Sequence, residues 1–224
     1  AAGKFGTPGW YADKPTVATP VEGDQQVALE WTAGDTNGLD ITGYKIEQHD
    51  GSSWSTITTT GVVGSYTSTG LTNGTVYKYR ISAVTDLGID PGGASVSADT
   101  VTKTPRGVPA TPGTLSLSAG SPSATVISLS WSAGSANGSV ITGYIIQKSV
   151  DSGSSWSTVT ANTGNTNTTY SATGLAGNTA HQFRIAAINV AGTGSYGNTP
   201  SLTTADPNPT VTSTGSPTQT DYTI

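Results

Sequence analysis

Apolar and polar residues alternate over several short runs of the chain. In residues 27–31 the apolar side chains occupy positions 27, 29 and 31, and in residues 77–83 they occupy every second position. A period of two places one face of an extended strand against a core and the other face in water. Turn-forming Gly, Thr, Asn and Pro separate these runs at intervals of roughly 8–12 residues, which is typical of an all-β sandwich. We therefore predict strands throughout and no helix.

The alternating runs occur twice because the chain contains an internal repeat. The segment Trp31–Tyr44 returns 100 positions later as Trp131–Tyr144, with Trp-x-Ala-Gly at its start and Ile-Thr-Gly-Tyr at its end. The offset grows to 102 and then 104 through small insertions, which are typical of surface turns. The repeat predicts two homologous domains, each large enough to form its own core. The matched positions continue through Trp54 and Trp156, Tyr66 and Tyr170, Leu71 and Leu175, Ala83 and Ala187, and Gly88 and Gly192.

The repeated motif resembles fibronectin type III domains. Each repeat has a Trp that closes one strand, a Gly-Tyr that opens the next, a Leu, and then Tyr-x-Tyr-Arg-Ile-x-Ala in the first repeat or His-x-Phe-Arg-Ile-x-Ala in the second. The resemblance covers residues 16–104 and 108–204, and it implies two tandem seven-stranded immunoglobulin-like β-sandwiches. It is specific for the fold and says almost nothing about function, because one fold serves many functions.

One position departs from the family pattern. Tyr77 occupies the place where the family's tyrosine forms a hydrogen bond across the corner before the sixth strand, and the second repeat has His181 there. An imidazole is shorter than a phenol and bonds differently, so we expect the second corner to be weaker or rebuilt. We interpret His181 as a structural substitution rather than as a ligand or catalytic residue.

Three further segments flank or join the repeats. Residues 1–15 form an N-terminal arm with aromatic residues in a Gly/Pro context, residues 105–112 form a linker with three prolines, and residues 205–224 form a Pro/Thr-rich C-terminal tail. Proline favours an extended, semi-stiff connection, which is what we expect of the linker.

The charge of the chain is low and uneven. Charged residues make up 10% of the sequence and the formal net charge is −5. Residues 16–104 hold ten acidic and four basic residues, whereas residues 108–204 hold one acidic residue and two basic ones. This balance argues against nucleic acid as a partner. The chain has no Cys, and no apolar run approaches the ~20 residues of a membrane span.

The residue types required for catalysis or for a cofactor are sparse. The chain has two His and no Cys, and it lacks nucleophile-elbow, phosphate-loop and zinc-protease motifs. Residues 35–40 (Asp-Thr-Asn-Gly-Leu-Asp) partly resemble a calcium loop, but the counterpart at 135–140 keeps only the Asn-Gly. The shared feature is therefore turn chemistry, because Asn-Gly tolerates positive φ. We expect no enzyme activity, no cofactor and no metal.

Two groups of aromatic residues are the candidate functional sites. Phe5, Trp10 and Tyr11 in the N-terminal arm, with Tyr222 in the tail, are candidates for assembly or docking. The three N-terminal aromatics either pack on the first domain or dock on another subunit.

Trp54 and Trp156 occupy equivalent positions after Ser-Ser. They either pack against the edge of each sandwich or stack on sugar rings.

These features favour a non-enzymatic structural or interaction protein, displayed on a virion, filament or cell surface and attached through its terminal arms. The expected partners are other protein subunits of a surface assembly (capsid, tail or filament) or a second copy of the chain, and the expected location is extracellular, at a cell surface or in a virion. The alternative is a carbohydrate-binding or spacer module of a secreted polysaccharide-degrading enzyme, for which the partners are glycans.

Overall fold

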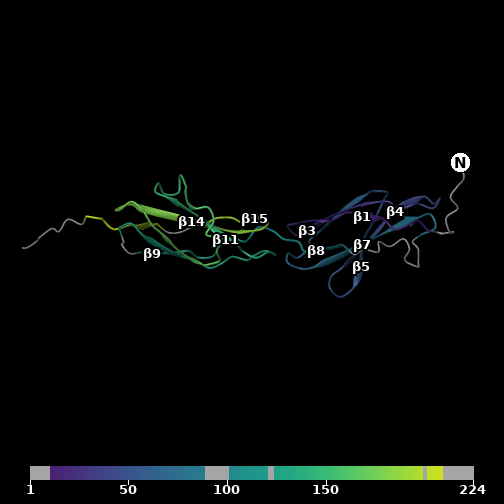
Figure 1. The fold of residues 1–224 in the computed structure, drawn as a ribbon, viewed down its shortest axis with the longest axis horizontal. Helices are drawn as coiled ribbons and strands as arrows, with labels where there is room; N and C mark the ends of the chain where they lie inside the picture. Colours follow the sequence, from purple (N-terminus) through teal and green to yellow (C-terminus); the bar gives the residue numbers. More distant parts are fainter. Residues whose placement is uncertain (1–10, 89–100, 121–123, 199–200, 209–224) are drawn as a thin grey trace, which may run out of the picture. The chain divides into compact units, whose positions relative to one another are not determined.

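The computed structural model describes residues 11–88, 101–120, 124–198 and 201–208, and strands are the only regular elements among them (Figure 1). The chain divides into two compact units. The first comprises residues 1–110 with segments 135–142 and 188–194, and the second comprises the other residues between 111 and 224. The expectation of an all-β fold with two sandwiches is confirmed.

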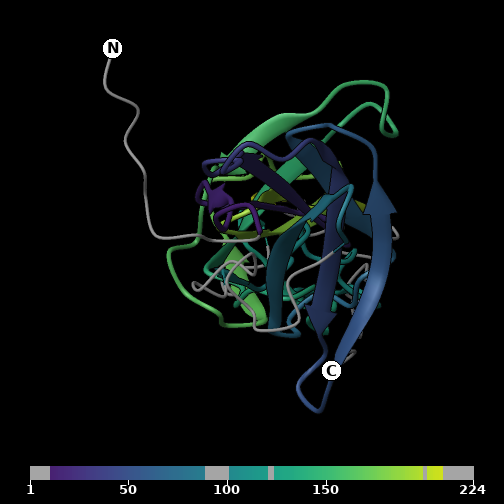
Figure 2. The ribbon, with the colours of Figure 1, turned by 90° about the vertical axis from the view of Figure 1, so that its right-hand side faces the viewer.

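The first repeat forms two antiparallel sheets. In one sheet the central strand β3 pairs with β1, β2 and β6, and the other sheet has the order β5-β4-β7-β8. The β4–β5 hairpin, in blue, forms one edge of this second sheet (Figure 2). The strands are β1 (Thr16–Val17), β2 (Val21–Gly23), β3 (Gln26–Thr32), β4 (Ile41–His49), β5 (Trp54–Thr60), β6 (Ser65–Thr69), β7 (Tyr77–Thr85) and β8 (Val101–Lys103).

The second repeat has the same two-sheet plan. One sheet has the order β13-β10-β9, and the other has the order β12-β11-β14, with β15, β16 and β17 each pairing with β14. The strands are β9 (Ser116–Ala119), β10 (Ile127–Ser130), β11 (Gly143–Ser149), β12 (Ser157–Thr160), β13 (Thr169–Ala172), β14 (Ala180–Asn189), β15 (Gly192–Thr193), β16 (Gly197–Asn198) and β17 (Leu202–Thr203).

The core of each repeat contains the residues that the alternation predicted. In β3, Val27, Leu29 and Trp31 are buried while their neighbours are exposed or half-buried. The repeated Trp and Tyr meet edge to face, with ring centroids 5.4 Å apart for Trp31 and Tyr44 and 5.0 Å apart for Trp131 and Tyr144. Edge-to-face aromatic pairs add stability beyond their buried area. The repeated Trp and Tyr therefore form the core contact between β3 and β4 and its counterpart in the second repeat.

The glycine before each of these tyrosines is fixed by a close neighbour. A Cβ atom on Gly43 would overlap the carbonyl oxygen of Thr60, and one on Gly143 would overlap the side chain of Asn162. No larger residue fits at either position without movement of the neighbouring strand or loop. Steric exclusion accounts for the Gly in the repeated Gly-Tyr.

The repeated Asn-Gly pairs adopt the same turn in both repeats. Asn37 and Asn137 have φ of 52° and 53°, and the following glycines have φ of 87° and 88°. The prediction that these loops share turn chemistry is confirmed.

The corner before the last long strand differs between the repeats as expected. In the first repeat the Thr72 backbone N–H donates to Tyr77 Oη (3.0 Å). In the second repeat the direction is reversed, because His181 Nε2–H donates to the carbonyl oxygen of Ala176 (3.1 Å). Thr204 Oγ1 donates to the same oxygen (2.6 Å), while the buried His181 Nδ1 has no partner among the described residues. The second corner is thus rebuilt around a carbonyl acceptor.

Candidate functional site

Each repeat holds the chain segment that leads into it through two equivalent hydrogen bonds. In the first repeat, Asn37 Nδ2 donates to the Tyr11 carbonyl oxygen (2.9 Å), and the Asp13 N–H donates to the Asp35 carbonyl oxygen (2.7 Å). Between them, Ala12 is 1% exposed and belongs to the hydrophobic core. We call residues 11–13 the leading segment of the first repeat.

The leading segment of the second repeat is residues 108–110. Asn137 Nδ2 donates to the Val108 carbonyl oxygen (2.9 Å), and the Ala110 N–H donates to the Ser135 carbonyl oxygen (2.9 Å). The turn that carries Asn137 therefore makes the same contacts as the turn that carries Asn37. The Asn-Gly turns clamp the incoming chain, a role that the sequence interpretation did not assign to them.

Among the aromatic docking candidates, Tyr11 alone lies within the described residues. Its backbone is fixed on the first sandwich and its side chain is half-buried. Phe5, Trp10 and Tyr222 lie outside the described residues. Docking of these aromatics on another subunit remains a prediction.

The two tryptophans proposed for sugar stacking each carry an arginine on one ring face. Arg80 Cζ lies 4.4 Å from the Trp54 ring centroid, and Arg184 Cζ lies 4.4 Å from the Trp156 ring centroid. A guanidinium over an indole face is attracted by the quadrupole of the ring. Both tryptophans are half-buried. This arrangement shows what one face of each ring packs against, and sugar stacking on the other face remains the untested alternative.

The arginine in the first repeat is paired with a buried carboxylate. Arg80 Nε donates to Glu47 Oε2 (2.8 Å), and Lys45 Nζ lies 2.9 Å from Glu47 Oε1. Burial by itself would raise the pKa of Glu47, but the hydrogen bonds and charges of Arg80 and Lys45 outweigh it, so the pKa lies below its usual value. Glu47 is therefore ionised at neutral pH and fully engaged by its two cations.

The second repeat keeps the arginine and replaces its charged neighbours. The residues at the positions of Lys45 and Glu47 are Ile145 and Gln147. Arg184 Nε donates to Gln147 Oε1 (2.7 Å). The Tyr196 ring lies on the guanidinium as well, with its centroid 4.4 Å from Arg184 Cζ. A position-by-position comparison of the repeats would have revealed this loss of charge.

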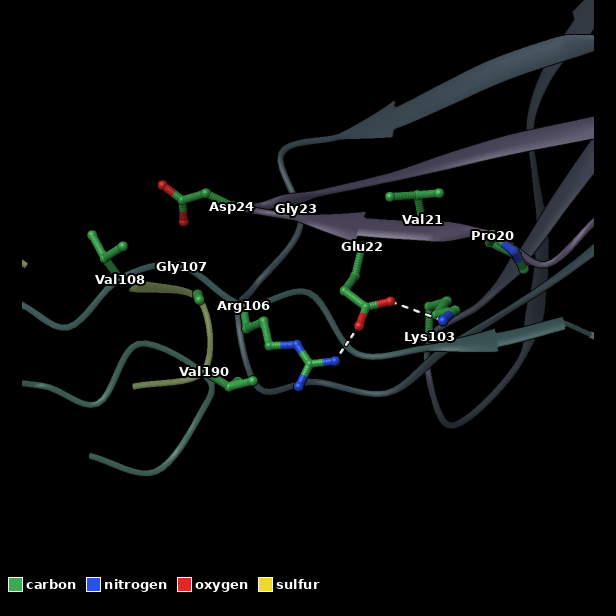
Figure 3. Close-up of a pocket in the computed structure, with 11 residues that line it drawn as sticks. Pro20, Val21, Glu22, Gly23, Asp24, Lys103, Arg106, Gly107, Val108 and Val190 are labelled. Carbon is green, nitrogen blue, oxygen red and sulfur yellow. Dashed lines mark hydrogen bonds and ion pairs between the residues drawn. The ribbon is translucent and has the colours of Figure 1, made fainter. Parts of the chain in front are cut away.

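Figure 3 shows a third cluster, in which Glu22 of β2 lies between Lys103 and Arg106. Lys103 Nζ lies 2.8 Å from Glu22 Oε2, and Arg106 binds Glu22 Oε1. These two hydrogen bonds lower the pKa of Glu22 to about 2. Because both carboxylate oxygens already have cationic partners, we interpret this cluster as a set of ion pairs that fixes the linker to the first sandwich.

The remaining carboxylates of interest stabilise turns. Asp35 Oδ1 accepts from the Asn37 N–H (2.9 Å) in the loop that resembles a calcium site. The backbone N–H and hydroxyl of Ser52 hold the pKa of Asp50 at about 2, and the hydroxyls of Ser149 and Ser155 do the same for Asp151. The described residues contain no group of three or more His, Cys, Asp or Glu positioned to hold a metal ion. No helix among them is long and apolar enough to cross a membrane.

The family model described as "Fibronectin type III domain" matches residues 13–99 and 110–203. Domains A168-A170 from titin are a structural neighbour with a TM-score of 0.52 and 21% identity, covering 88% of this chain and 61% of that one. The titin kinase with its flanking domains gives a TM-score of 0.39 at 29% identity over 44% of this chain and 17% of that one. The chicken CNTN1 FN1-FN3 domains give 0.40 at 18% identity, covering 87% and 69%. The titin A168-A170 structure supports the fold alone.

Proposed function

Because this chain belongs to the fibronectin type III family, with two tandem domains, we propose that it is a non-enzymatic structural protein of a virion, filament or cell surface, attached through its terminal arms. The tandem architecture makes it a structural or interaction module. Display on a surface assembly, with other protein subunits or a second copy as partners, is the more specific part of the proposal. The low charge of the second repeat supports it, because such a domain has little electrostatic protection against association.

The clamp on the leading segment is the observation that carries the attachment role. Residues 11–13 are fixed to the first sandwich by the Asn37 side chain, by a backbone hydrogen bond and by the buried Ala12. A partner bound by residues 1–10 would therefore be joined to the folded domain through an anchored segment. An arm anchored in this way suits attachment, because the domain follows whatever the arm binds.

The structure also sets where a test deletion must end. Removal of residues 1–10 leaves the clamped segment in place, whereas a deletion through residue 15 would remove Ala12 from the core. We expect the shorter deletion to reduce incorporation into the assembly at least about tenfold while leaving the melting temperature within about 2 °C, since no described core residue is lost. A matched deletion of residues 209–224 tests the tail in the same way. Unchanged incorporation of both variants would overturn the attachment role.

The copy number of the protein in its assembly tests the surface location. Quantitative mass spectrometry of purified particles, filaments or cell envelopes from the source organism should give a fixed ratio to a major subunit, retained after a high-salt wash. Absence from every particle, with the chain found free in the medium or joined to a longer enzyme, would overturn the proposal.

A further inference from the structure

The open guanidinium of Arg184 in the second repeat is the feature that the proposed function leaves unexplained. Its planar group lies against two aromatic rings, each with its centroid 4.4 Å from Cζ. Its Nε–H is used by Gln147 Oε1. Within the part of the chain that the structure describes, no carboxylate forms an ion pair with Arg184, and no residue accepts a hydrogen bond from Nη1 or Nη2.

The orientation of the supporting amide is fixed from both ends. Gln147 Oε1 accepts from Arg184, while Gln147 Nε2 faces Thr158 Oγ1 (3.4 Å) on the neighbouring strand β12. The aromatic rings and the amide thus restrict the guanidinium to one plane. A guanidinium held in a plane loses less conformational entropy when it forms a bidentate pair than a freely rotating one does.

We propose that Arg184, positioned by Trp156, Tyr196 and Gln147, binds a carboxylate side chain of an acidic protein segment through its Nη1–H and Nη2–H. A planar carboxylate matches this edge of a guanidinium with two parallel hydrogen bonds. The first repeat provides an internal comparison. There the Glu47 carboxylate accepts from the Nε–H of the equivalent Arg80 and neutralises its charge, whereas the neutral amide of Gln147 accepts from the Nε–H of Arg184. The second repeat offers the same Trp-supported arginine with that carboxylate removed.

The charge around the site favours an acidic protein segment over a nucleic acid or an anionic membrane. The second repeat has two basic residues and one acidic residue between 108 and 204, and Asp151 is engaged by Ser149 and Ser155. Nucleic acids and anionic membranes are bound by arrays of several cations, which this surface lacks. One arginine with aromatic walls suits one carboxylate at a time.

The test uses the whole chain in solution and does not depend on the attachment arms, so its result is separate from that of the proposed function. The probe is an acetylated, amidated hexaglutamate peptide, followed by NMR through the Trp156 indole N–H and the Arg184 Nε–H signals. We expect saturable shifts with a dissociation constant on the order of millimolar, because a single exposed ion pair contributes little. The shifts should shrink as salt rises, and a hexaglutamine peptide should produce none.

Three substitutions make the test specific. Gln147→Glu supplies an internal carboxylate, as in the first repeat, and should abolish peptide binding while keeping the aromatic stack. Arg184→Lys keeps the charge but loses the planar fork, and should weaken binding at least about threefold. Glu47→Gln is the matched gain of function, because it removes the carboxylate that neutralises Arg80 and should create peptide-dependent shifts at the Trp54 indole.

Several outcomes would overturn the proposal. They are the absence of any shift at Trp156 with about 10 mM peptide (a concentration above the expected millimolar dissociation constant), shifts that persist unchanged in Gln147→Glu, and inorganic phosphate binding as tightly as the peptide at the same signals. A melting curve of each variant shows whether the second sandwich remains folded, and Gln147→Glu adds no bulk at a half-buried position.

Discussion

We expect replacement of the corner residue by Phe to change the stability of the two domains in opposite directions. In the first repeat, Tyr77→Phe removes the only acceptor found for the Thr72 backbone N–H among the described residues. An unsatisfied donor costs about 1–3 kcal/mol when it is buried. Thr72 is exposed, so water replaces part of the lost bond, and we expect a loss of about 1 kcal/mol from the free energy of unfolding of the first domain.

In the second repeat, His181→Phe removes the hydrogen bond from His181 Nε2–H to the Ala176 carbonyl oxygen. The Ala176 carbonyl oxygen still accepts from Thr204 Oγ1 (2.6 Å). The substitution also removes the buried Nδ1, which has no hydrogen-bond partner in the described structure. A lost hydrogen bond costs about 1 kcal/mol and a buried unsatisfied atom costs about as much or more. We therefore expect the stability of the second domain to stay the same or to rise by about 1 kcal/mol.

Urea denaturation followed by NMR separates the two effects, because the Trp31 and Trp131 indole signals each report on one domain. Thermal melts give a second measurement, because in a domain of roughly 100 residues a change of 1 kcal/mol in the free energy of unfolding moves the melting temperature by about 4–8 °C. Two results would refute the reasoning. One is a free energy of unfolding of the first domain in Tyr77→Phe that stays within about 0.3 kcal/mol of the parent. The other is a loss of more than about 1 kcal/mol from the second domain in His181→Phe, because the Ala176 carbonyl oxygen keeps a hydrogen bond there.

Three further predictions follow from the geometry. The pKa of Glu22 is lowered to about 2, so its ion pairs stabilise the first domain at pH values above the unfolded-state pKa, and this stability is lost as the pH falls toward 2. In Glu22→Gln, the free energy of unfolding of the first domain should therefore fall less steeply with decreasing pH. Gly43→Ala should destabilise the first domain by more than about 2 kcal/mol because its Cβ meets a strand carbonyl, whereas Gly61→Ala, which has open space, should have little effect in thermal melts. Polysaccharide pull-downs should show no retention that depends on Trp54 or Trp156, because an arginine covers one face of each ring; retention by the parent chain that both Ala variants lose would contradict the packing interpretation.

Much of the fold could be predicted from the sequence because strand burial follows local alternation. Val27, Leu29 and Trp31 are buried as their spacing requires, and the repeated Trp, Gly and Tyr make equivalent contacts in both domains. The contacts at the candidate sites were predicted less well. Three of the four docking aromatics lie outside the described residues, and neither the clamp by Asn37 nor the arginine stacks were predicted.

The sequence by itself determined the class of fold, the duplication and the change from Tyr77 to His181, because each of these is a property of residues close together in the chain or of two matched segments. The tertiary structure decided which side chains meet across strands. Arg80 pairs with Glu47 from a position 33 residues away, and Arg184 bonds Gln147 from 37 residues away. Strand register sets such contacts, and register depends on the packing of both sheets. The charge that distinguishes Glu47 from Gln147 is therefore readable in the sequence, but its consequence for one arginine appears only in the folded sheet.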